Sequence, residues 1–196
     1  MTVRRSVQPA QVTVIEDGRR RTVPDRLATE EPMEIRVAGV GQVPRAVAVT
    51  MRTPGADFEL AVGFLLTEGL IAERHDIADI RYCEDVEDAA QQYNVLSVRL
   101  ARPFDASSLQ RNMFASSSCG VCGKASIDMI EVACRPIPEG PVVALDTLLG
   151  LPEVLRERQC TFEKTGGLHA TGLFTPAGEL VELREDIGRQ IGRAHV

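Results

Sequence analysis

Two cysteines separated by two residues are the first feature of this chain that points to chemistry. They are Cys119 and Cys122 in the segment SSSCGVCGKAS, and Lys124 follows them. The apolar pattern after Gly123 predicts a helix that begins there, and the unpaired N–H groups of a helix start favour a thiolate, as does a nearby lysine. A gap of two residues also lets one sulfur attack a species bound to the other. The spacing therefore favours a reactive thiol pair, as in a disulfide oxidoreductase, a sulfur carrier or a redox sensor.

Two other interpretations of the cysteine pair stay open. A structural zinc site takes four ligands, commonly from two such pairs, whereas here only Cys134, Cys160 and His169 are available, at irregular spacing. Cysteines can also be inert, buried hydrophobic residues, which suits Cys83, Cys134 and Cys160 better than a pair among serines and glycines. The competing functions are thus a zinc-binding or scaffold module and a general thiol–disulfide oxidoreductase.

Composition limits the partners that we expect. The 196 residues are 44% hydrophobic and 26% charged, which is typical of a globular protein. A net charge of -6 and the absence of tryptophan argue against a nucleic-acid surface. The N-terminus lacks the apolar core of a signal peptide, and the densest apolar run, residues 60–66, is too short to cross a membrane. We therefore expect a cytoplasmic protein. In the cytoplasm, a close cysteine pair is more often catalytic or metal-binding than a structural disulfide.

The first fifty residues are rich in runs that favour β-strands. Asp17-Gly18 lies between two such runs and predicts a hairpin. Residues 33–52 predict a second strand pair with its turn at Gly39 and Gly41. Residues 75–88 are expected to form a charged surface segment that leads to a strand at 93–100.

A helix is expected after residue 52, where the apolar spacing changes from two residues to three or four. Thr53 is expected to cap this helix, Pro54 suits its first position, and Gly69 is expected to end it. Its apolar face is expected to contain Phe58, Ala61, Val62, Leu65 and Leu66.

The second half predicts further helices and strands. Residues 141–160 indicate a short strand and then a helix, and residues 166–186 indicate a hairpin joined by a Pro-Ala-Gly turn. Alternating strand pairs and helices predict an α/β or α+β sandwich. We divide the chain into a β-rich part with one helix, residues 1–105, and a part that carries the cysteine pair, residues 106–196.

Four separated blocks resemble the formate dehydrogenase accessory sulfurtransferase family, FdhD. They are RTPGADFELAVGFLLTEGLI, SSSCGVCGK, TGGLHATGLF and LREDIGR, in that order, and the likeness runs from Val12 to Arg189. The resemblance implies a cytidine-deaminase-like fold with a smaller N-terminal β-rich domain, and a homodimer.

The same resemblance implies a sulfurtransferase. Such proteins take persulfide sulfur from a cysteine desulfurase and pass it to the molybdenum cofactor of formate dehydrogenase, a bis(molybdopterin guanine dinucleotide). Cys119 matches the persulfide carrier and Cys122 its partner. No permanent cofactor or metal site is implied, and the molybdenum cofactor is a client.

A few residues outside the cysteine pair are candidates for contact with that cofactor. Lys124, Gly167 and His169 are the candidates, although His169 is equally explained as a satisfied strand histidine and Gly167 as part of a turn. Asp186 and Arg189 either position a ligand or form an exposed ion pair.

The likeness stops abruptly near the end of the chain. After EDIGR the sequence continues as QIGRAHV, whereas the family continues with His-Asn and further elements. We expect residues 190–196 to be an aberrant tail and the C-terminal part, with a segment implicated in cofactor binding, to be missing. Poor solubility and weak cofactor binding are the expected consequences.

Overall fold

The structure is a computed structural model, and it describes residues 5–83, 93–104 and 139–188. The helical elements are α1 (Asp57–Thr67), the 3-10 turn η1 (Arg74–Asp76), α3 (Leu145–Arg158) and α4 (Cys160–Thr165). The strands are β1 (Val7–Glu16), β2 (Arg19–Ala28), β3 (Glu31–Ala38), β4 (Arg45–Arg52), β5 (Ile77–Tyr82), β6 (Val95–Leu100), β7 (His169–Phe174) and β8 (Leu180–Asp186).

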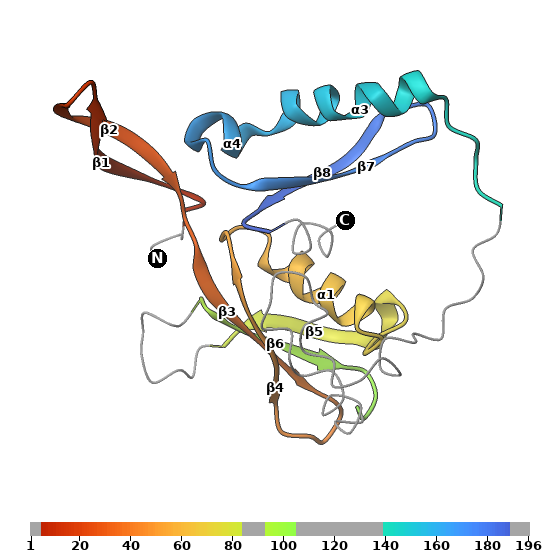
Figure 1. Ribbon diagram of the computed structural model, residues 1–196. Coiled ribbons are helices and arrows are strands. Elements are labelled where there is room, and N and C mark those ends of the chain that lie inside the picture. The colour runs from red at the N-terminus through yellow and green to blue at the C-terminus, as the bar shows by residue number, and fades with distance from the viewer. Residues whose placement is uncertain (1–4, 84–92, 105–138, 189–196) are drawn as a thin grey trace, which may run out of the picture.

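A four-stranded mixed sheet is the largest sheet of the described structure, and it lies below α1 in Figure 1. Its strand order is β4-β3-β6-β5, with β3 and β6 parallel and the outer pairs antiparallel. Helix α1 covers one face of this sheet, because alternate strand residues turn their apolar side chains toward it. The fully buried members of this core are Met33, Ile35, Val37, Ala61, Leu65, Leu96 and Val98.

Two hairpins form separate two-stranded sheets. Strands β1 and β2 pair over their whole length around Asp17 (φ 50°) and Gly18 (φ 75°), so the hairpin predicted at this dipeptide is confirmed. This hairpin projects from the sheet in Figure 1. Strands β7 and β8 form the other hairpin, also as predicted, with Gly178 (φ 87°) in its turn.

Helix α3 packs against the β7–β8 hairpin through two glycines. A Cβ atom on Gly172 would lie 2.7 Å from Leu155, and one on Gly178 would lie 2.8 Å from Thr147. Both positions therefore depend on the absence of a side chain. In Figure 1, α1 lies between the four-stranded sheet and the β7–β8 hairpin.

The start of α1 differs from the prediction. The helix begins at Asp57 with Ala56 at its N-cap, four residues after Thr53, and no side chain caps it. Thr53 instead donates its own amide to the carboxylate of Asp186 at 2.8 Å. The end is as predicted, because α1 stops at Thr67 and Gly69 follows with φ 72°.

The apolar face of α1 is also rotated from the predicted one. Leu60, Ala61 and Leu65 are its buried apolar residues, whereas Phe58 is 39% exposed and Leu66 is 50% exposed. Periodicity alone locates an apolar stripe to within about one residue, since neighbouring positions differ by roughly 100° around the helix.

Two elements were not expected from the sequence, and one predicted strand is absent from the described residues. Residues 77–82, predicted as a surface segment, form the edge strand β5. The charged residues of this segment made it resemble a surface loop in the sequence. In the strand, Asp79 and Arg81 point away from the core that Ile80 and Tyr82 contact. The short strand predicted near residue 142 is wrong, since Val142 is 97% exposed and unpaired with any described strand, and α4 was not predicted.

The structure belongs to the α+β class, as predicted. Mixed and antiparallel sheets with helices on their faces establish that class. The likeness to cytidine deaminases and the division at residue 105 stay predictions, and Thr53 and Asp186 contact each other across that division. Within the described ranges, no helix is long and apolar enough to span a membrane.

Candidate functional site

The cysteine pair itself lies outside the described residues. Cys119, Cys122 and Lys124 all fall between residues 105 and 138, and Cys134 does too. Of the other cysteines, Cys160 is exposed, so its prediction as a buried hydrophobic residue is wrong. Its place at the first position of the exposed helix α4 explains this.

Cys83 is half-buried at the end of β5, beside Arg36. A hydrogen bond to Glu34 is the main cause that raises the pKa of Arg36, and Cys83 adds a smaller contribution of the same sign. Cys83 thus lies in a polar contact rather than in a purely apolar pocket.

A buried arginine joins the first family-like block to the sheet. Arg52 ends β4 and is fully buried, and its guanidinium forms a forked pair with Asp57 at 2.8 and 3.2 Å. The same guanidinium donates to the side chain of Asn94 at 3.3 Å and to the carbonyl of Tyr93 at 3.0 Å. Because a buried charge must be paired and fully hydrogen-bonded to be tolerated, this cluster holds β4, α1 and the start of β6 together.

Tyr82 completes the cluster from β5. Its hydroxyl donates to Asp57 at 3.1 Å. Burial, followed by the negative charge of Asp57, raises the pKa of Tyr82 to about 12. The phenol therefore stays neutral at physiological pH and acts as a hydrogen-bond donor to the carboxylate.

The LREDIGR block joins three other elements through consecutive side chains. Arg184 pairs with Glu59 of α1 at 2.6 Å. Glu185 accepts the amides of Thr161 and Phe162 at 2.8 and 2.7 Å and so caps the start of α4. Asp186 then holds the loop before α1, so one strand end fixes α1, α4 and the β4–α1 loop.

Asp186 is therefore not the exposed ion pair that was one alternative. It is 1% exposed, and its carboxylate accepts the amides of Thr53 and Ile187 at 2.8 and 2.7 Å. Arg189, its suggested partner, lies outside the described residues.

The TGGLH segment forms a tight bend between α4 and β7. Gly166 is the left-handed C-cap of α4 (φ 67°), and the Gly167 amide donates to Thr165 Oγ1 at 3.2 Å. Leu168 has φ 92°, a strained value for a residue with a branched side chain, and such strain clusters at functional sites. The Gly167 amide is thus engaged within the bend.

His169 follows this bend as the first residue of β7. Its backbone lies opposite Asp186 in the hairpin register, and its side chain is exposed. In the described part of the chain, no group forms a hydrogen bond with its imidazole. Both interpretations of His169, a cofactor contact and a satisfied strand histidine, stay predictions.

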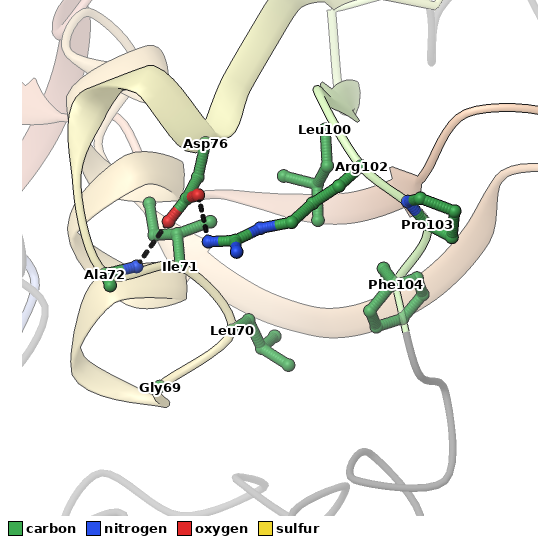
Figure 2. Close-up of a pocket in the computed structure, with 9 residues that line it drawn as sticks. All are labelled: Gly69, Leu70, Ile71, Ala72, Asp76, Leu100, Arg102, Pro103 and Phe104. Carbon is green, nitrogen blue, oxygen red and sulfur yellow. Dashed lines mark hydrogen bonds and ion pairs between the residues drawn. The ribbon is translucent and has the colours of Figure 1, made fainter.

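A cavity of about 270 Å³ lies between the turn after α1 and the end of β6, and Figure 2 shows the residues that line it. Asp76 lines it but is saturated, since it accepts the Ala72 amide at 2.7 Å and the Glu73 amide at 3.2 Å and pairs with Arg102. These bonds, the Ala72 amide first, lower the pKa of Asp76. The carboxylate thus shapes the turn and has little capacity left for a ligand.

Several of these residues were missed from the sequence. Arg52 and Asp57 both lie in the first family-like block, and the presence of two opposite charges beside a buried helix was the available signal. Nothing in the sequence indicated the conformation of Leu168. Among residues 5–83, 93–104 and 139–188, no group of three or more His, Cys, Asp or Glu side chains could hold a metal ion.

The fold defines the class of protein to which this chain is similar. A protein of Desulfotalea psychrophila, whose crystal structure is described as that of a formate dehydrogenase accessory protein, matches with a TM-score of 0.62 at 20% identity. The match covers 95% of this chain and 64% of that one. This likeness establishes a shared α+β fold.

The chain belongs to the FdhD/NarQ family, whose model matches residues 28–191. Among its relatives, the sulfur carrier protein FdhD of Mycolicibacterium paratuberculosis is 48% identical over 184 residues, and that of Streptomyces coelicolor is 45% identical over 203 residues. These matches cover 91% and 97% of this chain. The chain spans 66% and 70% of the length of the two relatives.

Proposed function

We propose that this protein is a sulfur carrier in the maturation of formate dehydrogenase, and that Cys119 holds the transferred sulfur. The observation that carries this proposal is membership of the FdhD/NarQ family over residues 28–191, a range that contains Cys119 and Cys122. Relatives at 44–48% identity bear the name sulfur carrier protein.

The loading step is a thiol–persulfide exchange. The Cys119 thiolate attacks the terminal sulfur of a persulfide on a cysteine desulfurase, forming an S–S bond on Cys119 as the bond to the desulfurase sulfur breaks. The desulfurase leaves as a thiolate, so no net oxidation occurs. Lys124, two residues after Cys122, favours the ionised form of the pair.

The delivery step transfers that sulfur to the client. The Cys122 thiolate attacks the inner sulfur of the Cys119 persulfide, a Cys119–Cys122 disulfide forms, and the outer sulfur leaves as hydrosulfide toward the molybdenum of the bis(molybdopterin guanine dinucleotide) cofactor. The two electrons that reduce this sulfur come from the two cysteines. A cellular dithiol then reduces the disulfide, and we place the cycle in the cytoplasm, where thiols stay reduced.

The described residues have a supporting part in this proposal. Arg184, Glu185 and Asp186 fix the elements on which the TGGLH bend depends, and the exposed imidazole of His169 is free to contact the cofactor. Gly167 lets the chain approach the client closely, while its amide stays bonded to Thr165. We further propose that the protein acts as a homodimer that meets both a cysteine desulfurase and formate dehydrogenase.

Mass spectrometry tests the loading step. The purified chain is incubated with a cysteine desulfurase and cysteine, and its intact mass is measured without reductant. We expect a gain of one sulfur atom in the wild type and in Cys122→Ala, and none in Cys119→Ala. Cys160→Ala is the matched control, because the Cys160 thiol is exposed to the desulfurase but lies outside the Cys119–Cys122 motif. Sulfur that persists in Cys119→Ala would contradict the assignment.

A further inference from the structure

The face of the central sheet opposite α1 holds a cavity of about 420 Å³. Ala38 of β3, Ser97 and Arg99 of β6, and Arg81 of β5 line it, and each alternates with a core residue on the other face. The volume is within the usual range for a small-molecule site, about 300–1,000 Å³. Nothing in the proposed sulfur chemistry uses this cavity.

The cavity exists because its floor is small and its wall is fixed. Ala38 and Ser97 leave space on the sheet, and the loop from Gly39 to Pro44 forms the wall. The Gln42 side chain fastens this loop, since its carbonyl accepts the amides of Gly39 and Phe104 at 2.9 and 3.0 Å. The same side chain donates to the Phe104 carbonyl at 2.9 Å, which completes the anchor.

The lack of a side chain at Gly39 also fixes the position of the wall. A Cβ atom at this position would lie 2.6 Å from the carbonyl oxygen of Arg102 and 2.7 Å from the amide nitrogen of Phe104. Only glycine therefore lets the loop lie so close to the segment after β6. The cavity is thus formed before any ligand arrives.

Two guanidinium groups, those of Arg81 and Arg99, supply the positive charge of the lining. Arg99 has neither a carboxylate nor a carbonyl partner among the residues that the structure describes. Arg81 is 3.7 Å from Asp79, and both side chains are largely exposed, so this ion pair is weak and open to exchange. Ser97 lies on the floor of the cavity, opposite Arg81 in the strand register.

The third guanidinium on this face is already neutralised. Arg36 lies beside Ser97 in the parallel β3–β6 register and pairs with Glu34 at 2.5 Å. Among the described residues of the lining, the two positive charges of Arg81 and Arg99 exceed the one negative charge of Asp79, in a chain whose net charge is -6. A local excess of this kind attracts an anion against the field of the whole molecule.

We infer that this cavity binds an oxyanion of the phosphate or diphosphate type, with Arg99 as its main contact and Arg81 and Ser97 as further donors. Guanidinium groups bind tetrahedral oxyanions through two parallel N–H bonds, which suits a rigid cavity better than a flexible surface. Val40 and Gly41 lie in the wall, and within the described residues their amides have no acceptor. Among the described lining residues, Asp79 is the one carboxylate, and it pairs with Arg81. A ligand that binds Arg81 must therefore compete with Asp79 for its guanidinium.

Isothermal titration calorimetry with inorganic diphosphate tests this inference. We expect saturable binding by the wild type that weakens as salt is added, and at least about tenfold weaker binding by Arg99→Gln, which loses the forked contact. Ser97→Val, which fills the floor without a change of charge, is also expected to weaken binding. The matched control is Arg45→Gln, an exposed arginine of β4 outside the cavity, which is expected to bind within about twofold of the wild type.

Two results would overturn the inference. One is the absence of diphosphate binding by the folded wild type at low salt. The other is an equal loss of binding in Arg45→Gln and Arg99→Gln, which would show a diffuse surface effect. Neither result depends on sulfur transfer, so this site and the proposed function fail separately.

A second titration identifies the source of the oxyanion. If a nucleoside diphosphate binds more tightly than inorganic diphosphate and keeps its dependence on Arg99, the site takes the diphosphate of a larger ligand. If the two bind equally, the site takes the free ion. Both results support an oxyanion site.

Discussion

Asp186 shows how one buried carboxylate can hold distant parts of a chain together. Its carboxylate accepts the amides of Thr53 and Ile187, which joins the end of β8 to the loop that precedes α1. At 1% exposure the residue is almost entirely shielded from solvent. The residue is thus a positioning residue for the family-like blocks on either side.

Replacement of Asp186 by alanine is expected to lower the free energy of unfolding by about 1–3 kcal/mol, because buried amides lose their acceptor. Urea unfolding of the purified protein measures this. Asp25→Ala is the matched control, since Asp25 is exposed and, within the described part of the chain, accepts only the neighbouring Arg26 amide. Its cost is expected to be below about 0.5 kcal/mol. Equal losses in the two variants would contradict the role given to Asp186.

Tyr82 makes the stability of the fold depend on pH in the alkaline range. Its pKa is raised from 10.0 to about 12 by burial, so folding favours the neutral phenol. The stabilisation is complete below pH 10.0, where the unfolded phenol is also neutral, and it is lost as the pH rises toward 12. We therefore expect the wild type to be more stable than Tyr82→Phe at about pH 9, and this difference to shrink at about pH 11.

Denaturant unfolding of both proteins at the two pH values measures the effect of Tyr82. The comparison removes the contribution of other titrating groups, because both chains carry them. A stability difference that stays constant across this pH range would show that the phenol is not coupled to folding.

At the scale of elements, the Arg52–Asp57 pair joins β4 to α1. Replacement of Arg52 by methionine keeps much of the side-chain volume but leaves the Asp57 carboxylate buried without its partner. We expect a loss of about 3–5 kcal/mol in the free energy of unfolding, measured by guanidinium chloride titration. Arg45→Met, on the exposed start of the same strand, controls for the substitution and is expected to cost less than about 0.5 kcal/mol. A loss below 1 kcal/mol in Arg52→Met would mean that the pair contributes little.

Elements defined by local chemistry were predictable from the sequence. The β1–β2 turn needs positive φ at Asp17 and Gly18, and both residue types favour it, so the hairpin follows from a dipeptide. The end of α1 follows from Gly69 in the same way. In each case the residues that decide the structure are neighbours in the chain.

Elements decided by distant residues were not predictable. Thr53 is a good helix cap by type, but its amide is taken by Asp186, and the helix starts later. The candidate site has the same character, because Arg52 finds its partners in Asp57, Tyr93 and Asn94 only after the sheet has formed. The cysteine pair was singled out by its spacing and its family-like block, and its role stays a prediction because it lies outside the described residues.

At the scale of the whole molecule, the described parts join the first of the family-like blocks to the last. The first block packs on the sheet, the last block fastens it to α4 and the β7–β8 hairpin, and His169 opens to solvent beside them. A sulfur carrier needs such a stable support, since a bound sulfur must reach its client before it is lost to solvent thiols. The cost of the strained Leu168, about 1–3 kcal/mol, is tolerable only with that support.

Transfer of labelled sulfur tests whether this protein is a carrier. The chain is loaded with radioactive sulfur from cysteine by a cysteine desulfurase, separated from the desulfurase, and mixed with formate dehydrogenase that lacks its sulfur ligand. We predict that the label moves to the molybdenum cofactor and that formate oxidation appears with it, whereas Cys119→Ala transfers no label. Activation of formate dehydrogenase by Cys119→Ala at the wild-type level, or label that never leaves the loaded chain, would contradict the proposed function.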